Sequence, residues 1–241
     1  MKILITNDDG IHSEGIELLA LWAKKLGEVT VVAPLVEQSA KSQSIDIHDP
    51  FPVIKVEFPG GIPAWAVGST PADCIRVADT GLFLDYDLVF SGVNRGFNVG
   101  WDIVYSATCG AVFEAAYSGK KAVAFSTSPD GFPAASLALD RVWDYIQKNR
   151  LLEATDLLNV NIAPPGDGTI YWTRQAGPYY RDTFESRGGD LLQAVGHSVY
   201  QGGFDPELDL DVVMNGHISV TPLSVNRTDL ETYRNRKAQL C

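Results

Sequence analysis

The chain has 241 residues, of which 45% are hydrophobic, 20% charged and 10% aromatic, and its formal net charge is −11 with a pI near 4.7. This composition is typical of a globular protein. The acidity argues against a nucleic-acid polymer or an anionic membrane as the main partner. A small phosphorylated substrate stays compatible with it, because a bound metal can reverse the field inside a cleft.

The apolar segment after Met1, "KILIT", is too short for a secretory signal, and no run approaches the roughly 20 apolar residues of a membrane helix. The three cysteines, Cys74, Cys109 and Cys241, are odd in number and widely spaced. They indicate neither a disulfide framework nor a zinc site. We therefore predict a cytoplasmic protein.

Strand-like and helix-like segments alternate over residues 1–150. The predicted strands are 2–6, 28–34, 51–58, 64–67, 87–94 and 121–127. The predicted helices are 15–27, 70–83, 108–120 and 134–149, the second of them with Thr70 as N-cap. Strands separated by helices imply right-handed crossovers and a mainly parallel sheet covered on both faces. We predict an α/β fold with a Rossmann-like, doubly wound core.

The second half of the chain lacks the regular alternation of strands and helices. Its strand-like segments are 157–165, 169–175 and 217–226, and Thr228 is predicted to cap a terminal helix. Residues 177–211 are polar, glycine-rich and too long for a structureless loop, so we predict a protruding, extended hairpin or a partner-binding arm. No linker divides the chain. We expect one domain over 1–241, with a core at 1–150 and a C-terminal elaboration at 151–241.

In doubly wound sheets, ligands bind beyond the carboxyl ends of the strands. Here the first predicted strand runs into "NDDG", which contains Asp8 and Asp9. Adjacent carboxylates repel each other, and a buried pair is costly unless a proton or a cation lies between them. A solvated Asx turn is the alternative interpretation of this pair.

Two further strand ends carry oxygen ligands. The second strand leads into a loop with Ser39, Ser42 and Ser44, and the strand at 87–94 is followed by Asn94 and Asn98. Carboxylate, hydroxyl and amide oxygens form a hard donor set that suits Mg²⁺, Mn²⁺ or Ca²⁺ better than zinc. Ser42 and Ser44 remain alternatives to Ser39 in that set.

A helix N-terminus follows these strand ends. Ser106, Thr108 and Gly110 place hydroxyl and backbone N–H groups there, an arrangement that binds phosphate without lysine. A divalent cation on one side and the helix terminus on the other would hold a phosphoryl group between them. The sequence therefore favours a metal-dependent phosphoester hydrolase.

The same residues resemble the SurE family of survival-protein 5′-nucleotidases. The matching motifs occur in the family's order and span most of the chain: "ITNDDGIHSEGI", "VVAP" followed by "EQSAKSQS", "GSTPADCI", "SGVNRGFNVGWDIVYSATCGAVFEAA" and "GHISVTPL". The first and fourth of these motifs are the most specific.

The resemblance implies a divalent-metal phosphatase that acts on nucleoside 5′-monophosphates, with 3′-nucleotides and short polyphosphate as further substrates. It implies one bound Mg²⁺ or Mn²⁺, held by Asp8, Asp9, Ser39 and Asn94. It also implies homodimers or homotetramers that exchange C-terminal segments and use an extended hairpin. The implied phosphate contacts are Asn98, Ser106, Thr108 and Gly110, and the implied catalytic residues are Asp8, Asp9, Asn98 and Ser106.

Several positions differ from the family pattern. Ala107 and Cys109 replace the usual Gly and Val of the phosphate loop, Ser13 and Glu14 stand where Ala-Pro is usual, and Ala40 replaces a glycine. Ala107 matters only if its backbone needs a positive φ. These differences concern substrate preference and rate more than the fold or the metal.

Alternative functions and roles remain. A non-catalytic nucleotide-binding module is favoured only by Ala107 and Cys109. A dinucleotide oxidoreductase is disfavoured because no G-x-G-x-x-G follows the first strand. Direct attack by water is preferred to attack by Asp8 or Asp9 as a nucleophile. Cys109 is expected to be a buried structural residue and not a nucleophile.

Asp102 is either a proton relay or an exposed acid. His12 is expected to be a surface histidine, and Trp101 is a candidate contact for the nucleobase.

Overall fold

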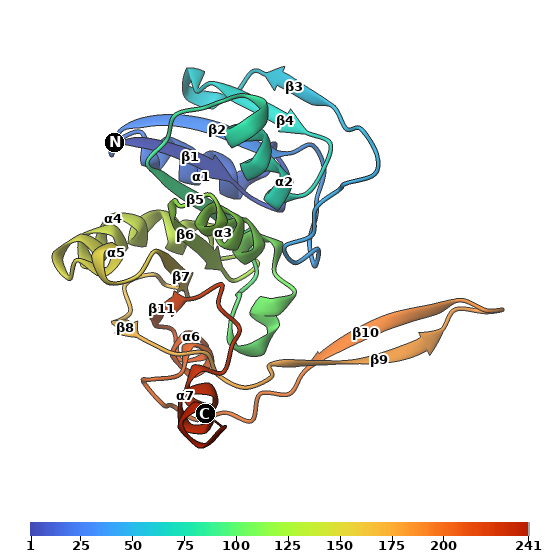
Figure 1. Ribbon diagram of the computed structural model, residues 1–241, viewed down its shortest axis with the longest axis vertical. Helices are drawn as coiled ribbons and strands as arrows, with labels where there is room; N and C mark the ends of the chain where they lie inside the picture. The colour runs from blue at the N-terminus through green and yellow to red at the C-terminus, as the bar shows by residue number, and fades with distance from the viewer. Residues whose placement is uncertain (241) are drawn as a thin grey trace.

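The computed structural model describes residues 1–240 and is built on a nine-stranded sheet of order β3-β4-β2-β1-β5-β6-β7-β11-β8 (Figure 1). All pairings from β4 to β7 are parallel, whereas β3 pairs antiparallel with β4 and β11 antiparallel with β7. The strands of this sheet are β1 (Lys2–Thr6), β2 (Glu28–Pro34), β3 (Val53–Val56), β4 (Ala64–Val67), β5 (Leu88–Arg95), β6 (Lys121–Thr127), β7 (Leu157–Ile162), β8 (Ile170–Trp172) and β11 (Ile218–Leu223).

Helices cover both faces of the sheet, as the alternation of buried residues in β1 requires. Ile3 and Ile5 belong to the core beneath α1 (Glu14–Ala23) and α4 (Phe132–Lys148). Leu4 points to the opposite face and packs in the core beneath α2 (Pro71–Arg76) and α3 (Ala107–Tyr117). Short helical segments complete this half: η1 (Pro59–Gly61), η2 (Val77–Gly81), η3 (Gly100–Val104) and α5 (Leu151–Ala154).

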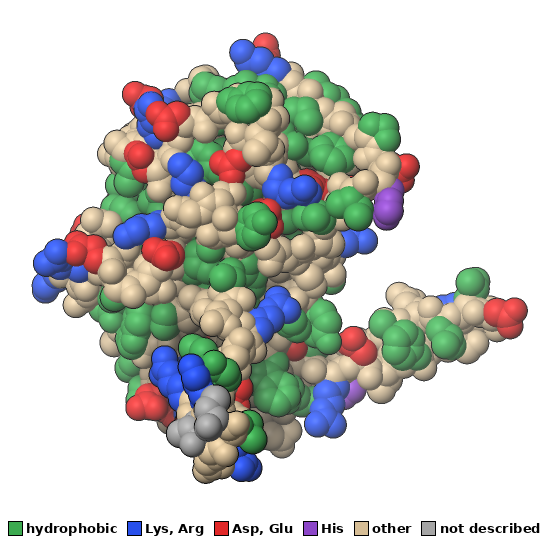
Figure 2. All heavy atoms as spheres, in the orientation of Figure 1, with side chains coloured by type: hydrophobic (Ala, Val, Ile, Leu, Met, Phe, Trp, Pro, Cys, Tyr) green, Lys and Arg blue, Asp and Glu red, His purple; other side chains and the backbone are tan. Residues whose placement is uncertain are grey.

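The C-terminal part adds β8 and β11 to the sheet edge and carries two further helices, α6 (Asp209–Met214) and α7 (Leu230–Leu240). A separate antiparallel hairpin of β9 (Tyr180–Ser186) and β10 (Leu192–Ser198) projects far from the rest of the molecule (Figure 1). Hydrophobic side chains lie along this arm (Figure 2). Phe184, Leu191 and Leu192 are each about two-thirds exposed.

The predicted fold class is confirmed: the sheet is mainly parallel, doubly wound and followed by an extended hairpin. Three predictions were wrong in detail. The helix expected over 70–83 leaves α-geometry after Arg76 and continues as the π-turn η2, and α6 begins inside residues 177–211, where a hairpin or arm was predicted. Asp229, not Thr228, caps α7, because its carboxylate accepts the N–H of Thr232 at 2.9 Å. Across residues 1–240, none of the helices has the length and apolar character needed to cross a membrane.

Candidate active site

Asp8 lies at the carboxyl end of β1 and is buried, with 4% of its surface exposed. Its Oδ1 accepts a hydrogen bond of 2.6 Å from the Thr108 hydroxyl at the start of α3. The pKa of Asp8 is raised to about 6, mainly by burial and also by the neighbouring charge of Asp9, whereas the bonds from Thr108 oppose the rise. Asp8 therefore joins the first strand to the helix N-terminus and carries a charge that its surroundings do not favour.

Asp9 joins the same turn to the end of β5. Its Oδ2 accepts the backbone N–H of Arg95 at 3.1 Å, next to Asn94. The Asn94 Nδ2 donates to the Gly96 carbonyl at 2.8 Å, so the amide oxygen of Asn94 is left as an acceptor. Burial raises the pKa of Asp9, as it does that of Asp8. Two carboxylates and an amide oxygen thus come together at adjacent strand ends.

The loop after β2 reaches this turn through its backbone. The N–H of Gln38 donates to the Asp8 carbonyl at 2.7 Å, which places Ser39 beside the acidic pair. The Ser39 hydroxyl donates to Glu37 Oε1 at 2.8 Å. Further along, the N–H of Ser42 donates to the Tyr105 carbonyl at 3.0 Å, whereas the Ser44 carbonyl accepts from Thr70 on α2. Ser39 is therefore the serine of this loop that the structure places next to Asp8.

The N-terminus of α3 faces Asp8. Ser106 caps the helix, its hydroxyl oxygen accepting the Cys109 N–H at 3.0 Å, and its carbonyl accepts the Gly110 N–H at 3.0 Å. The N–H group of Ala107 thus remains for a ligand, whereas that of Thr108 donates to the Asp8 carboxylate and stabilises its charge. Gly110 serves packing, because a Cβ there would lie 2.2 Å from the Ser42 carbonyl oxygen.

Asn98 is held by polar side chains that end β6 and β7. Its Nδ2 donates to Ser126 Oγ at 2.8 Å, and its backbone N–H donates to Asn161 Oδ1 at 2.8 Å. The Asn98 carbonyl accepts from Asn159 at 2.8 Å and from Asn161 at 2.9 Å. Sequence reasoning did not identify these two buried asparagines. Their spacing of two residues in "NVN" places both on one face of β7, and this was the available signal.

The donor set fits a divalent cation of the magnesium type. Within residues 1–240, neither Asp8 nor Asp9 forms an ion pair with a Lys, Arg or His side chain. Two buried side-chain oxygens at the same strand ends, Asn7 Oδ1 and Ser91 Oγ, have no hydrogen-bond partner in this described part. Two carboxylates without a direct ion pair, beside hydroxyl and amide oxygens, form the environment that Mg²⁺ or Mn²⁺ would complete.

Comparison with known families decides the chain's relationships. The family model described as "Survival protein SurE" matches residues 3–182. The chain belongs to the SurE family. The match contains all the acidic, serine and asparagine residues of the site described above.

Individual relatives agree over nearly the full length. A Thermosipho melanesiensis protein named "5′-nucleotidase SurE" is 35% identical over 96% of this chain and 94% of its own. A Petrotoga mobilis protein of the same name is also 35% identical, over 100% of this chain and 99% of its own. The crystal structure of the SurE protein from Aquifex aeolicus matches with a TM-score of 0.82 and 28% identity, covering all of both chains.

The remaining candidates have other surroundings in this SurE-family chain. The Asp102 carboxylate accepts the Tyr180 N–H at 3.1 Å at the base of the hairpin, and His12 is exposed. Cys109 is fully buried, and burial raises its pKa to about 12. Trp101 is 65% exposed and borders a cavity between η3 and the segment after β11. Ala107 has no positive φ, so the missing glycine causes no strain there.

Proposed function

We propose that this chain is a metal-dependent phosphomonoester hydrolase that releases phosphate from nucleoside 5′-monophosphates. The observation that carries the proposal is the meeting of Asp8 with the N-terminus of α3 through the 2.6 Å bond from Thr108. A cation site and an anion site are thereby adjacent, which suits a phosphoryl group bound between them. The names of the relatives support the nucleotide as the substrate class.

In this proposal Asp8, Asp9, Ser39 and Asn94 hold one Mg²⁺ or Mn²⁺. When bound, the cation supplies Lewis acidity toward the phosphoryl oxygens and activates water for attack. The Thr108 hydroxyl fixes the orientation of the Asp8 carboxylate. Because that carboxylate is buried and already hydrogen-bonded, direct attack by water is favoured over Asp8 as a nucleophile.

Phosphate binding is assigned to Asn98, Ser106, Thr108 and Gly110, and catalysis to Asp8, Asp9, Asn98 and Ser106. Within the α3 terminus, the N–H group of Ala107 has the freedom to bind an oxyanion, since that of Gly110 donates to Ser106 and that of Thr108 donates to Asp8. This N–H group and the dipole of α3 would stabilise the charge on the equatorial oxygens in the transition state. The contribution of Gly110 is then to let the serine loop approach the helix.

The test is phosphate release from AMP by EDTA-treated protein, with Mn²⁺ or Mg²⁺ restored. We expect metal-dependent release, reduced by about 100-fold or more in Asp8→Asn, because a ligand and its charge are lost. Asp85→Asn, an exposed acid paired with Lys2, is the matched control and should behave like the wild type. Folded protein that binds AMP without releasing phosphate under any metal would instead be a nucleotide-binding module. Parallel assays with 3′-AMP and tripolyphosphate rank the further substrates.

A further inference from the structure

The loop at 35–52, which contains Ser39, includes no helix or strand and is internally strained. Ala40 and Ser42 have φ values of 60° and 55°, a conformation that costs energy for residues with a Cβ. A chain in this state stays in place only when contacts from outside the loop hold it. The relevant contacts come from α2 and α3.

Asp73 on α2 is the first of these contacts. Only 1% of its surface is exposed. Its Oδ2 accepts the backbone N–H of Asp46 in the loop at 2.8 Å and the Ser69 hydroxyl at 2.6 Å, while its Oδ1 accepts from Arg76 at 2.8 Å. Asp73 belongs to the "GSTPADCI" motif, which the catalytic proposal leaves without a role.

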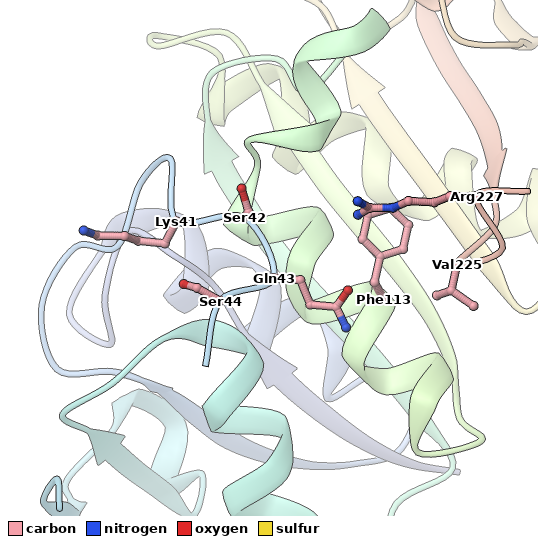
Figure 3. Close-up of a pocket in the computed structure, with 7 residues that line it drawn as sticks. All are labelled: Lys41, Ser42, Gln43, Ser44, Phe113, Val225 and Arg227. Carbon is pink, nitrogen blue, oxygen red and sulfur yellow. The ribbon is translucent and has the colours of Figure 1, made fainter. Parts of the chain in front are cut away.

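Glu114 on α3 is the second contact. It is 8% exposed, and its Oε2 accepts from the side chain of Gln43 in the loop at 2.9 Å. Its Oε1 lies 4.0 Å from Arg76 Nε, so one guanidinium lies between the two acids. In Figure 3 the Gln43 side chain extends along α3 toward Phe113. The Thr70 hydroxyl adds a bond of 2.6 Å to the Ser44 carbonyl.

The loop is not packed on all sides. A cavity of about 510 Å³ separates loop residues 41–44 from Phe113 on α3 and from Val225 and Arg227 (Figure 3). The loop therefore has room to move if the contacts from Asp73 and Glu114 are lost. Moving it would also withdraw the Ser42 backbone from Tyr105 and Gly110, beside the phosphate-binding terminus.

We propose that Asp73 and Glu114 are positioning residues that, bridged by Arg76, clamp the serine loop against α2 and α3 so that Ser39 reaches the cation. The role in catalysis rests on the proposed function, whereas the clamping itself does not. Neither acid touches the reacting atoms. Asp73 holds the backbone N–H of Asp46 and Glu114 holds the side chain of Gln43, both beyond Ser39 in the loop.

Trypsin reports the clamp directly, because Lys41 is exposed and lies two residues before Gln43, which is bonded to Glu114 on α3. In metal-free protein, we expect Glu114→Ala to speed cleavage after Lys41 by about tenfold, since losing a charged hydrogen bond makes local opening easier. Glu114→Gln, which can still accept from Gln43, should return the rate toward that of the wild type. Asp73→Asn tests the second acid.

Glu207→Ala is the matched control, since Glu207 pairs with Arg174 at an exposed site and not with Arg150. Cleavage after Arg150 serves as an internal reference, and a rise at both sites in Glu114→Ala would mean general unfolding and overturn the proposal. Unchanged cleavage after Lys41 in both Glu114→Ala and Asp73→Asn would also overturn it. The catalytic role predicts that the same variants need about fivefold more Mn²⁺ for half-maximal AMP hydrolysis. Wild-type protein inactive on AMP would refute the proposed function and leave the cleavage result standing.

Discussion

At Asp8, burial disfavours the charged form of the carboxyl group. The folded state raises the pKa of this carboxyl from 3.8 to about 6, mainly through desolvation. The folded protein therefore holds a proton that the unfolded chain has released between these two values. Stability from this group is fully present below the unfolded pKa and is lost as the pH rises through the folded one. The full loss is roughly 3 kcal/mol above pH 7.

This predicts a pH-dependent gain in Asp8→Asn. In metal-free protein, the variant should be more stable than the wild type by roughly 2–3 kcal/mol at pH 7.5, and the difference should vanish near pH 4. The amide oxygen of the variant can still accept the hydrogen bond from Thr108, so the two proteins differ mainly in the charge at this position. Urea unfolding at pH 7.5 and pH 4 measures the difference in their unfolding free energies. A difference independent of pH would show that the charge of Asp8 is compensated in the folded protein.

Cys109 is predicted to be chemically inert despite its place in the phosphate loop. It is fully buried, its thiol lies 3.7 Å from Asn159 Oδ1, and its pKa of about 12 leaves almost no thiolate at neutral pH. Cys109→Ala should keep the AMP hydrolysis rate within about threefold of the wild type. Iodoacetamide labelling of the native protein, read by peptide mass spectrometry, should leave Cys109 unmodified. Rapid labelling, or activity abolished in folded Cys109→Ala, would point to a nucleophile.

At the scale of elements, the proposed metal site depends on how closely α1 packs against the end of β5. Gly15 makes this approach possible, because a Cβ there would lie 1.9 Å from the Val93 carbonyl oxygen, one residue before Asn94. Gly15→Ala must push the helix or the strand end aside. We expect it to lose about 2–4 kcal/mol in urea unfolding and to bind Mn²⁺ more weakly.

Gly177→Ala is the control for that packing argument. Gly177 is exposed, and a Cβ there would have no atom within 4 Å. Its substitution should change the unfolding free energy by no more than about 0.5 kcal/mol. Equal losses in both glycine variants would contradict the proposed close packing of α1 on β5.

The elements that the sequence predicted best are those whose apolar pattern and flanking residues indicate the same element with the same ends. The buried strands at 2–6, 28–34, 64–67 and 121–127 have the predicted bounds, and Thr70 caps α2 as expected. The helix α6 was missed because Asp209 begins it within a polar, glycine-rich stretch. That acid is buried and accepts the N–H groups of Gly100, Ala176 and Leu210. Its partners are distant in sequence, so no local pattern could reveal it.

The same limit applies to the site. That Asp8, Asp9 and Asn94 lie together could be predicted, because parallel strands end at one edge of the sheet and their ends meet there. The buried hydrogen bonds that hold Asn98 beside these residues could not be predicted. Asn159 and Asn161 lie in an apolar run and pair with Asn98 more than sixty positions earlier. Such contacts depend on strand order, which the pattern of a single strand does not specify.

At the scale of the whole molecule, the projecting hairpin lacks the support that strands ordinarily need. The strands β9 and β10 pair only with each other in the described structure, and nearly all their residues are exposed. An isolated two-stranded sheet is at best marginally stable in water. Exposed Phe184, Leu191 and Leu192 add an apolar surface to this arm (Figure 2). We therefore propose that a second copy of the chain covers it.

This proposal predicts that shortening the arm lowers the oligomeric state without unfolding the core. Asp182 pairs with Gly196, so an Asn-Gly turn can replace residues 183–195 and close the remaining strands. A second variant with Phe184, Leu191 and Leu192 changed to Ser keeps the arm but removes its apolar surface. Light scattering after size exclusion should give a smaller mass for both variants than for the wild type, with a melting temperature within a few degrees of it. Equal masses in all three proteins would mean that subunits associate elsewhere, and a loss of mass only on shortening would assign the contact to the backbone of the arm.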